Sequence, residues 1–340
     1  MTPRTAFAAL RRTTLAGMAL AACTLAFGQS APIELKATHF LPPNHAFHKE
    51  LLRWGEELQK KSNGRLTLKV FPSGQMGPTP RQFDLVRTGV ADIGVGLTGA
   101  TPGRFPMTEV SNLPFVFADS TTASRRMTQL APKYLSKEFE GVKLLQLTIT
   151  PPLKFHMSKT KFETLADFKG QRIRYAGELF AASVKAFGAT PVPVSPGETV
   201  DAMSKGTVDG CLFPWEGAQS FQISTVAKVS YEPGVNAASF FWVMNPAAYD
   251  RLPADLKALI DGTSGIATAE RIGKQLDAAE DEGRAYMKGK GVEVLRFSAA
   301  LQDQMRGAVK AIVEEHIGKL EAKGQPARAF HESLSAKSGT

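Results

Sequence analysis

The residues best suited to chemistry in this sequence are two arginines, Arg172 and Arg174, in the segment LADFKGQRIRYAG at residues 165–177. Polar and apolar side chains alternate through QRIRY, which predicts a half-buried β-strand with both arginines on the face opposite Ile173. A planar guanidinium offers parallel N–H groups to both oxygens of a carboxylate, and the small residues that end the segment leave room for an anion. The segment therefore indicates a carboxylate site, with a plain surface strand carrying two solvated arginines as the alternative.

The composition bounds the class of protein. The chain of 340 residues is long enough for two domains with sizeable cores, and its 43% hydrophobic and 21% charged residues are typical of a globular protein. The formal net charge is +9, but basic and acidic residues alternate along most of the sequence. Because there is no polybasic block and no interleaving of arginines with aromatic residues, nucleic acid is not an expected partner. A mild positive balance fits a protein that handles anions.

Residues 1–30 have the features of a signal peptide that is cleaved near its end, so the protein is expected to leave the cytoplasm. Basic residues through Arg12 precede an apolar run at 13–28, which is too short and too rich in Ala and Thr to predict a membrane span. Two variants stay open. The arginine pair that ends at Arg12 resembles a twin-arginine signal, and Cys23 lies in a lipoprotein-like context that would make it a lipid anchor. After cleavage only Cys211 is left, so no internal disulfide is expected.

Strand and helix patterns alternate after the signal peptide, and Asn44 is expected to cap the first helix. This β-α-β-α-β order predicts an α/β domain with a largely parallel sheet. The expected elements are strand 32–40, helix 45–62, strand 65–71, helix 81–88 and strand 91–94.

The later part of the chain predicts a second lobe that is interleaved with the first. Pro151 and Pro152 mark the place where the chain crosses between lobes, and a helical pattern at 254–288 is interrupted only around 262–265. An amphipathic helix is expected at 299–323. The expected strands are 142–149, 155–157, 171–175, 190–194, 208–212, 229–231, 238–244 and 292–297.

Motifs along most of the chain occur in the order that one protein family shows. They are SNGRLTLKVFPSGQMG at 62–77, VRTGVADIG at 86–94, the stretch from RFP to LPF at 104–115, the arginine segment at 165–177, VDG at 208–210, and VMN followed by LP at 243–253. Together they resemble the DctP-like solute-binding proteins of tripartite ATP-independent periplasmic (TRAP) transporters, over residues 33–325.

This resemblance implies a two-lobed, periplasmic-binding-protein-like α/β fold with interleaved lobes, shared strands and a long lobe-spanning helix. The function it implies is capture of a small organic carboxylate in the cleft and delivery to TRAP membrane subunits. Neither an enzyme, a cofactor nor a metal is expected. The expected divisions are lobe I at 31–152 plus about 239–280, lobe II at 153–238 plus about 281–327, and a C-terminal tail at 328–340.

By the same resemblance, Arg174 is the carboxylate-binding arginine, the last residue of the G-x-x-I-R pattern at 170–174. Truncating a buried bidentate partner of this kind typically costs about 2–5 kcal/mol, because the ligand charge is left unpaired. Arg172 is then expected to point away from the cleft or to form a surface ion pair.

Departures from the family's pattern concern the ligand. Many relatives follow the Asp-Gly motif with an Asn that hydrogen-bonds the ligand, but this chain has Phe213 there, and a second basic position falls on Lys154 or His156. A site with many rings and few donors discriminates against polyols, so we expect a monocarboxylate or 2-oxoacid with an apolar or aromatic body. A sugar acid or a dicarboxylate is the alternative. The other expected ligand contacts are Phe40, Thr98, Trp215 and Trp242.

Two other patterns suggest a nucleotide site and a metal site, but the neighbouring residues do not support either. The sequence GVGLTG at 94–99 matches a dinucleotide fingerprint, but the prolines that follow it forbid the helix such a site needs, so a cleft-edge loop is expected instead. His39, His45 and His48 lack a fourth donor for a metal.

A secreted hydrolase or isomerase that uses Cys211 or His156 is the alternative of another class, since catalytic partners can be distant in sequence. A buried core cysteine is the plainer interpretation of Cys211.

Overall fold

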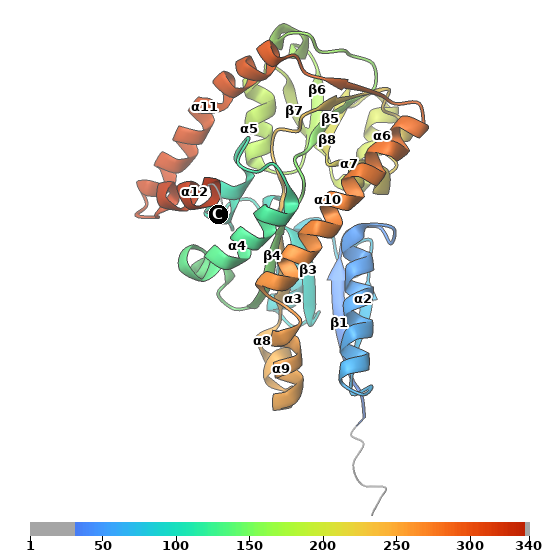
Figure 1. Ribbon diagram of the computed structural model, residues 1–340, viewed down its shortest axis with the longest axis vertical. Helices are drawn as coiled ribbons and strands as arrows, with labels where there is room; N and C mark the ends of the chain where they lie inside the picture. The colour runs from blue at the N-terminus through green and yellow to red at the C-terminus, as the bar shows by residue number, and fades with distance from the viewer. Residues whose placement is uncertain (1–30, 337–340) are drawn as a thin grey trace, which may run out of the picture.

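The computed structural model describes residues 31–336 and has two lobes, each built on a mixed β-sheet with helices packed around it (Figure 1). The signal peptide expected at 1–30 lies outside the described residues. The first sheet has the strand order β2-β1-β3-β10-β4. Its strands are β1 (Ile33–His39), β2 (Leu66–Phe71), β3 (Ile93–Leu97), β4 (Lys143–Ile149) and β10 (Ser239–Met244).

The second sheet has the strand order β11-β9-β5-β8-β6-β7, so the described residues form an α/β fold with two lobes, as expected. In it β6 runs parallel to both β7 and β8, whereas β5 is antiparallel to β8 and β9. Its strands are β5 (Lys154–Met157), β6 (Arg172–Tyr175), β7 (Thr190–Pro193), β8 (Gly210–Phe213), β9 (Val229–Glu232) and β11 (Glu293–Arg296).

The first lobe follows the predicted order of elements, and its sheet includes the later strand expected at 238–244. β1 is parallel to β2 and β3, and β10 enters between β3 and β4 in the antiparallel sense. Every residue of β10 is buried, as a central strand of apolar residues requires. The helices of this lobe are α2 (Ala46–Lys61), α3 (Gln82–Arg87), α4 (Ser120–Tyr134), α8 (Pro246–Asp250) and α9 (Ala254–Gly262).

The helix α2 begins differently from the prediction. His45, not Asn44, is the N-cap, because the His45 side chain accepts a hydrogen bond from the N–H of Phe47. The Asn44 amide instead donates to the carbonyl of Ser220 in the other lobe, at 3.2 Å. The expected cap residue is therefore part of a contact between the lobes.

The chain crosses between the lobes in paired extended segments. Residues 150–153 run beside 235–238, with the N–H of Leu153 donating to Asn236 O and the N–H of Val235 donating to Leu153 O. The crossing lies where Pro151 and Pro152 predict it. These segments join β4 to β5 and β9 to β10, which is why each sheet contains strands from distant parts of the sequence.

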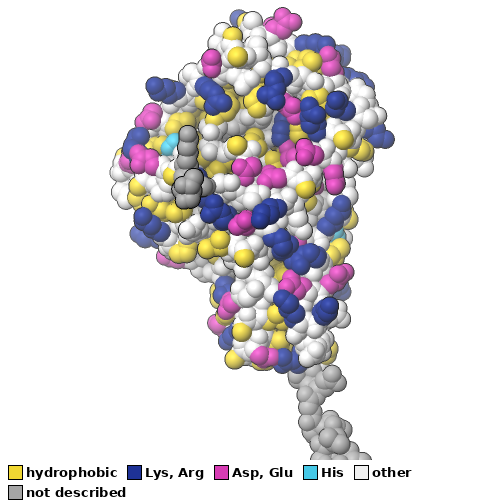
Figure 2. Space-filling model, in the orientation of Figure 1, with side chains coloured by type: hydrophobic (Ala, Val, Ile, Leu, Met, Phe, Trp, Pro, Cys, Tyr) yellow, Lys and Arg dark blue, Asp and Glu magenta, His cyan; other side chains and the backbone are white. Residues whose placement is uncertain are grey.

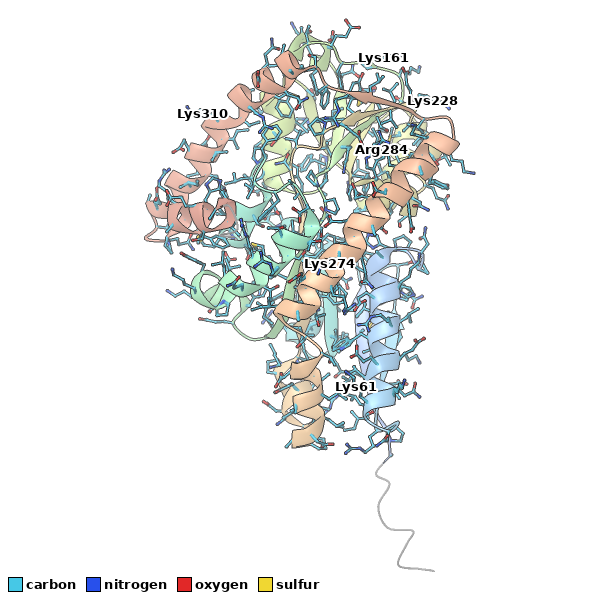
Figure 3. All side chains as sticks on the ribbon, in the orientation of Figure 1. Lys61, Lys161, Lys228, Lys274, Arg284 and Lys310 are labelled. Atoms are coloured by element: carbon cyan, nitrogen blue, oxygen red, sulfur yellow. The ribbon has the colours of Figure 1, made fainter. Side chains whose placement is uncertain are left out.

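The predicted long helix is two helices, α9 and α10 (Ile266–Gly289), separated at the expected interruption, where Gly265 has a φ of 85°. α10 runs diagonally across both lobes (Figure 1) and packs on α4 in one and on α7 (Trp215–Ser220) in the other. Lys274 and Arg284 mark its course from the first lobe to the second (Figure 3). The Arg284 guanidinium donates to the carboxylate of Glu232.

The C-terminal helices return the chain from the second lobe to the first. α11 (Ala299–Glu321) contacts α5 (Glu178–Ala186) in the second lobe, and α12 (Ala327–Ser335) packs on α4 (Figure 1). The tail expected at 328–340 is thus largely helical as far as it is described. The buried Phe330 and Leu334, four residues apart, anchor it. The remaining helix of the second lobe is α6 (Thr199–Ser204).

Two further features are the distribution of charge on the surface and the hydropathy of the helices. On the face in Figure 2, Lys and Arg side chains are interspersed with Asp and Glu. Among residues 31–336, no helix is both long enough and apolar enough to cross a membrane.

The packing of α10 gives a test of stability. A Cβ on Gly273 would lie 2.6 Å from the carbonyl oxygen of Ser120 and from Cα of Thr121, so α4 and α10 must separate to admit it. We expect Gly273→Ala to lower the free energy of unfolding by about 1–3 kcal/mol, as overpacking does. The matched control is Gly307→Ala in α11, which meets no atom within 4 Å and should raise stability by about 0.5–1 kcal/mol. Urea unfolding of both variants measures the difference, and equal effects would contradict this packing.

Candidate functional site

Arg174 lies on β6 with its guanidinium enclosed, leaving 1% of the residue exposed. The strand places it beside β7 and β8, whose ends provide two carbonyl acceptors. Nε donates to Val194 O at 3.0 Å and Nη1 to Leu212 O at 3.2 Å. The guanidinium carbon lies 4.5 Å from the ring centroid of Phe213. These contacts fix the plane of the group without neutralising its charge.

The Nη2 atom of Arg174 is buried and has no hydrogen-bond partner among the described residues. No carboxylate of residues 31–336 forms an ion pair with this side chain either. Burial lowers the pKa of Arg174 to about 10, which still leaves the group charged at neutral pH. A buried cation with a free donor edge has the chemistry needed to bind an anion.

Arg172, two residues earlier on the same strand, differs from Arg174 because it is exposed and has a carboxylate partner. Its guanidinium is exposed and pairs with Asp209, with Nε to Oδ2 at 3.0 Å and Nη2 to Oδ1 at 2.8 Å. The Arg172 ion pair lowers the pKa of Asp209. This surface pair agrees with the expectation that Arg172 stays out of the cleft.

A cavity of about 930 Å³ lies between the lobes at Arg174. The first lobe lines it with Phe40, the turn at 73–80 and part of the segment 97–102. The second lobe lines it with residues 174–178 and 193–197. Arg174 and Glu178 are the charged side chains of this lining, and Glu178 is exposed.

The lobes touch at one edge of this cleft. A Cβ on Gly99 would lie 2.9 Å from the carbonyl oxygen of Ala176 and 3.2 Å from Cα of Gly177. Only glycine at position 99 permits this backbone approach without displacement. The contact sets how closely the lobes meet beside Arg174.

An inner pocket of about 50 Å³ adjoins the cleft and shares Arg174 with it. Four phenylalanine rings surround this inner pocket, together with aliphatic residues and the side chains of His45 and Thr150. The rings belong to Phe40, Phe213, Phe221 and Phe240. Of the side chains expected to contact ligand, Arg174, Phe40 and Phe213 line the cleft or the inner pocket.

Lys154, His156 and Trp215 do not line either cavity. Lys154 forms a buried ion pair with Glu280 of α10. The His156 ring is held between Ser230 Oγ at 2.8 Å and Phe213 O at 3.1 Å, and burial lowers its pKa to about 3. Because a carbonyl only accepts, Nε2 of His156 carries the hydrogen.

Trp215, Thr98 and Trp242 also have partners in the protein interior. The indole N–H of Trp215 donates to Glu232 at 3.1 Å, and that of Trp242 to Thr148 at 3.0 Å. Thr98 donates to the carbonyl of Ser239. These expected contacts therefore support the lobes behind the cleft.

Phe240 and Phe221 are the aromatic residues of the inner pocket that the sequence did not indicate as ligand contacts. Alternation along β10 could have found the first, because Phe240 and Trp242 share one face of the strand. Phe240 lies at the pocket, whereas Trp242 lies deeper, edge-on to Phe47. Phe221 follows α7 and has no comparable sequence signal.

A polar network joins the lobes behind the inner pocket. The Glu216 carboxylate on α7 accepts the N–H of Ala46 at the start of α2, at 2.9 Å. Its second oxygen lies 3.2 Å from Nε2 of His45. The N–H of Glu216 in turn donates to Glu280, the partner of Lys154. One carboxylate thus caps a helix of the opposite lobe.

The described residues do not form an assembled site for catalysis by Cys211 or His156, or for a metal. Burial raises the pKa of the Cys211 thiol to about 12, and both nitrogens of His156, its neighbour across the strand pair, have other partners. In the histidine group, Nε2 of His39 lies 3.0 Å from Nδ1 of His48. No three His, Cys, Asp or Glu side chains of residues 31–336 are grouped to hold a metal. The segment 94–99 ends in a short 3₁₀ turn.

Comparison with known proteins agrees with this geometry. Residues 37–319 match the model of the bacterial extracellular solute-binding proteins, family 7, called DctP. The chain belongs to this family, and the resemblance inferred from its motifs is confirmed. It is a solute-binding protein of the TRAP type, a class defined by binding and transport of organic acids rather than by catalysis.

Among solved structures, a TRAP solute-binding protein from Rhodoferax ferrireducens with copurified benzoate has a TM-score of 0.85 and 28% identity, covering 89% of this chain and 96% of its own. One from Bordetella bronchiseptica with bound (R)- and (S)-mandelate has a TM-score of 0.84 and 29% identity, covering 89% and 98%. The 2,3-diketo-L-gulonate-binding periplasmic protein of Escherichia coli is 26% identical, over 75% of this chain and 80% of its own.

Near the cleft, a buried acid makes stability depend on pH. Glu109 is 6% exposed, and burial, followed by the charges of Glu178 and Glu138, raises its pKa to about 8. The folded protein therefore binds a proton that the unfolded chain releases near pH 4.5. Stability from this group is full below pH 4.5 and falls as the pH rises to about 8.

We expect Glu109→Gln to remove this decline. The loss of unfolding free energy between pH 4.5 and pH 8 should therefore be smaller in the variant than in the wild-type protein, by up to about 4 kcal/mol. Urea unfolding at both pH values measures it. The control is Glu315→Gln, which removes an exposed carboxylate of α11 and should leave the pH difference nearly unchanged. A Glu109→Gln variant with the wild-type pH profile would contradict the assignment.

Proposed function

We propose that this protein captures a small monocarboxylate or 2-oxoacid with an apolar or aromatic body in the cleft between its lobes, without converting it. The single observation that carries the proposal is the Arg174 guanidinium, which is buried, charged and without an acceptor for Nη2 among residues 31–336. A ligand carboxylate supplies the missing acceptor and the missing charge.

The lining of the site supports an apolar body. Phe40, Phe213 and other rings lie around Arg174, while the wider cleft combines proline and aliphatic residues with the polar side chains of Ser73, Gln75, Thr79 and Ser195. A ligand hydroxyl that faces the rings around Arg174 would lose hydrogen bonds to water without replacing them, so an apolar group is favoured next to the carboxylate. Two structurally similar proteins hold benzoate and mandelate, both aromatic monocarboxylates, which supports the same class of ligand.

The alternative is a sugar acid or a dicarboxylate, and a relative that binds 2,3-diketo-L-gulonate gives it weight. A dicarboxylate needs a second cation, but the cleft lining described here offers Arg174 alone and places the carboxylate of Glu178 in the same cavity. Like charges in one site repel, so this lining favours a single carboxylate.

Delivery requires that ligand binding change the lobes. A ligand that contacts Arg174 in one lobe and Phe40 in the other stabilises the closed arrangement, provided that it binds the open form less tightly. The closed protein then presents a joint surface to TRAP membrane subunits in the periplasm. Export depends on the signal peptide at 1–30, with lipid anchoring through Cys23 as the variant.

Arg174→Ala tests the anion site directly. Loss of the guanidinium leaves the ligand carboxylate desolvated and unpaired, so benzoate affinity should fall by about 2–5 kcal/mol. Calorimetry with benzoate measures it. The matched control is Arg172→Ala on the same strand, whose guanidinium faces Asp209 and whose loss should leave affinity within about twofold. Unchanged affinity in Arg174→Ala would overturn the site even if the fold is correct.

Thermal-shift screening tests the class of ligand. Aryl and alkyl monocarboxylates should raise the Tm of the wild-type protein, because a ligand bound only to the folded state stabilises it by mass action. Hexuronates and C4-dicarboxylates should give little shift at the same concentrations. Strong stabilisation by uronates with none by aryl or alkyl carboxylates contradicts the proposal, and Arg174→Ala serves as the control for binding elsewhere.

A further inference from the structure

The inner pocket is a second compartment of the site that differs from the cleft in size and polarity. Its lining overlaps that of the cleft at Phe40, Leu97, Arg174, Ala176 and Pro196. The two compartments therefore meet at the guanidinium. A carboxylate held there has its neighbouring carbon at the junction, so groups on that carbon can enter either compartment.

Size decides which group enters the inner pocket. Its volume is about 50 Å³, against about 930 Å³ for the cleft. A single water needs about 10–15 Å³, and a cavity of about 150 Å³ holds benzene. The inner pocket therefore fits a methyl or ethyl group and excludes a ring, which must remain in the cleft.

Polarity narrows the choice further. Both ring nitrogens of His45 have partners. Nδ1 accepts a hydrogen bond from the N–H of Phe47 at 3.1 Å, and Nε2 lies 3.2 Å from a carboxylate oxygen of Glu216. The Thr150 hydroxyl oxygen accepts the N–H of Ala238 at 3.0 Å. The rest of the lining is almost wholly carbon. Within this lining, only Arg174 and Thr150 keep a side-chain donor without an acceptor, so a ligand hydroxyl directed at the rings and aliphatic residues would exchange water for hydrocarbon, which is unfavourable.

We propose that the inner pocket is a subsite for a small alkyl group on the carbon next to the ligand carboxylate. It accepts methyl or ethyl and rejects hydroxyl at that position. This inference rests on the proposed function, because it takes Arg174 as the carboxylate anchor. It makes the protein selective for α-alkyl monocarboxylates whose larger body lies in the cleft.

Three matched acids test the subsite by calorimetry on the wild-type protein: phenylacetate, α-methylphenylacetate and α-hydroxyphenylacetate (mandelate). The better enantiomer of α-methylphenylacetate should bind about tenfold more tightly than phenylacetate, the usual effect of one methyl group in an apolar pocket. Mandelate should bind no more tightly than phenylacetate. Equal affinity for the first two acids, or tightest binding of mandelate, overturns the subsite.

A pocket-filling variant locates the effect. Ala238 lines the inner pocket, and its backbone N–H and carbonyl, not its side chain, pair with Thr150. Ala238→Leu should abolish the advantage of α-methylphenylacetate while phenylacetate still binds. The control is Ala311→Leu, the same substitution at an exposed position of α11 that lines neither cavity, and it should keep the advantage. If Ala238→Leu keeps it too, the subsite is refuted.

Failure of the subsite and failure of the proposed function give different results. If none of the three acids binds, or if Arg174→Ala binds them as well as wild type does, the proposed function fails. If they bind through Arg174 but show no preference for the methyl group, only the subsite fails. Circular dichroism establishes that each variant is folded, and the wild-type ligand series decides the question even where Ala238→Leu does not fold.

Discussion

The structure depends on a buried positive charge that the protein leaves without a negative partner. Arg174 has lost water on nearly all sides, and two backbone carbonyls offset only part of that cost. Its pKa is lowered because of burial, yet the group stays charged at neutral pH. An anion beside the guanidinium would supply both the missing charge and the missing acceptor, and this is the reason that the proposed ligand is a carboxylate.

The lobes hold that charge at a boundary that they define together. Gly99 of one lobe meets Ala176 of the other at backbone distance, and Glu216 caps α2 across the interface. The Glu216 network continues through Glu280 to Lys154, so α10 is coupled to the same contact. These contacts stabilise the arrangement of the lobes that the structure shows, and in the proposed function the ligand adds to them by binding this arrangement more tightly than an open one.

Local patterns predicted the elements and the strand that carries Arg174, but not the partners of distant residues. Alternation in QRIRY placed Arg172 and Arg174 on a strand, and the helical pattern located the break at Gly265. Lys154 lies in sequence where a second basic ligand contact is expected, but Glu280, 126 residues later, takes its charge. Such a pairing is created by the tertiary fold and leaves no local signal. Likewise, α12 packs on α4, and this tertiary contact buries the apolar face of α12 and stabilises it as a helix.

Phe213 contacts the Arg174 guanidinium and also forms part of the inner pocket. Its ring stacks on the guanidinium, so one side chain fixes the cation and shapes the space beside it. A cation–π contact that is shielded from water contributes about 2 kcal/mol, at least as much as a typical neutral hydrogen bond. A ring here can therefore hold the arginine as firmly as an amide would, but it offers a ligand hydroxyl nothing. In the proposed site, a phenylalanine at position 213 leaves the Nη2 edge of Arg174 available for a carboxylate and favours hydrocarbon over hydroxyl groups beside it.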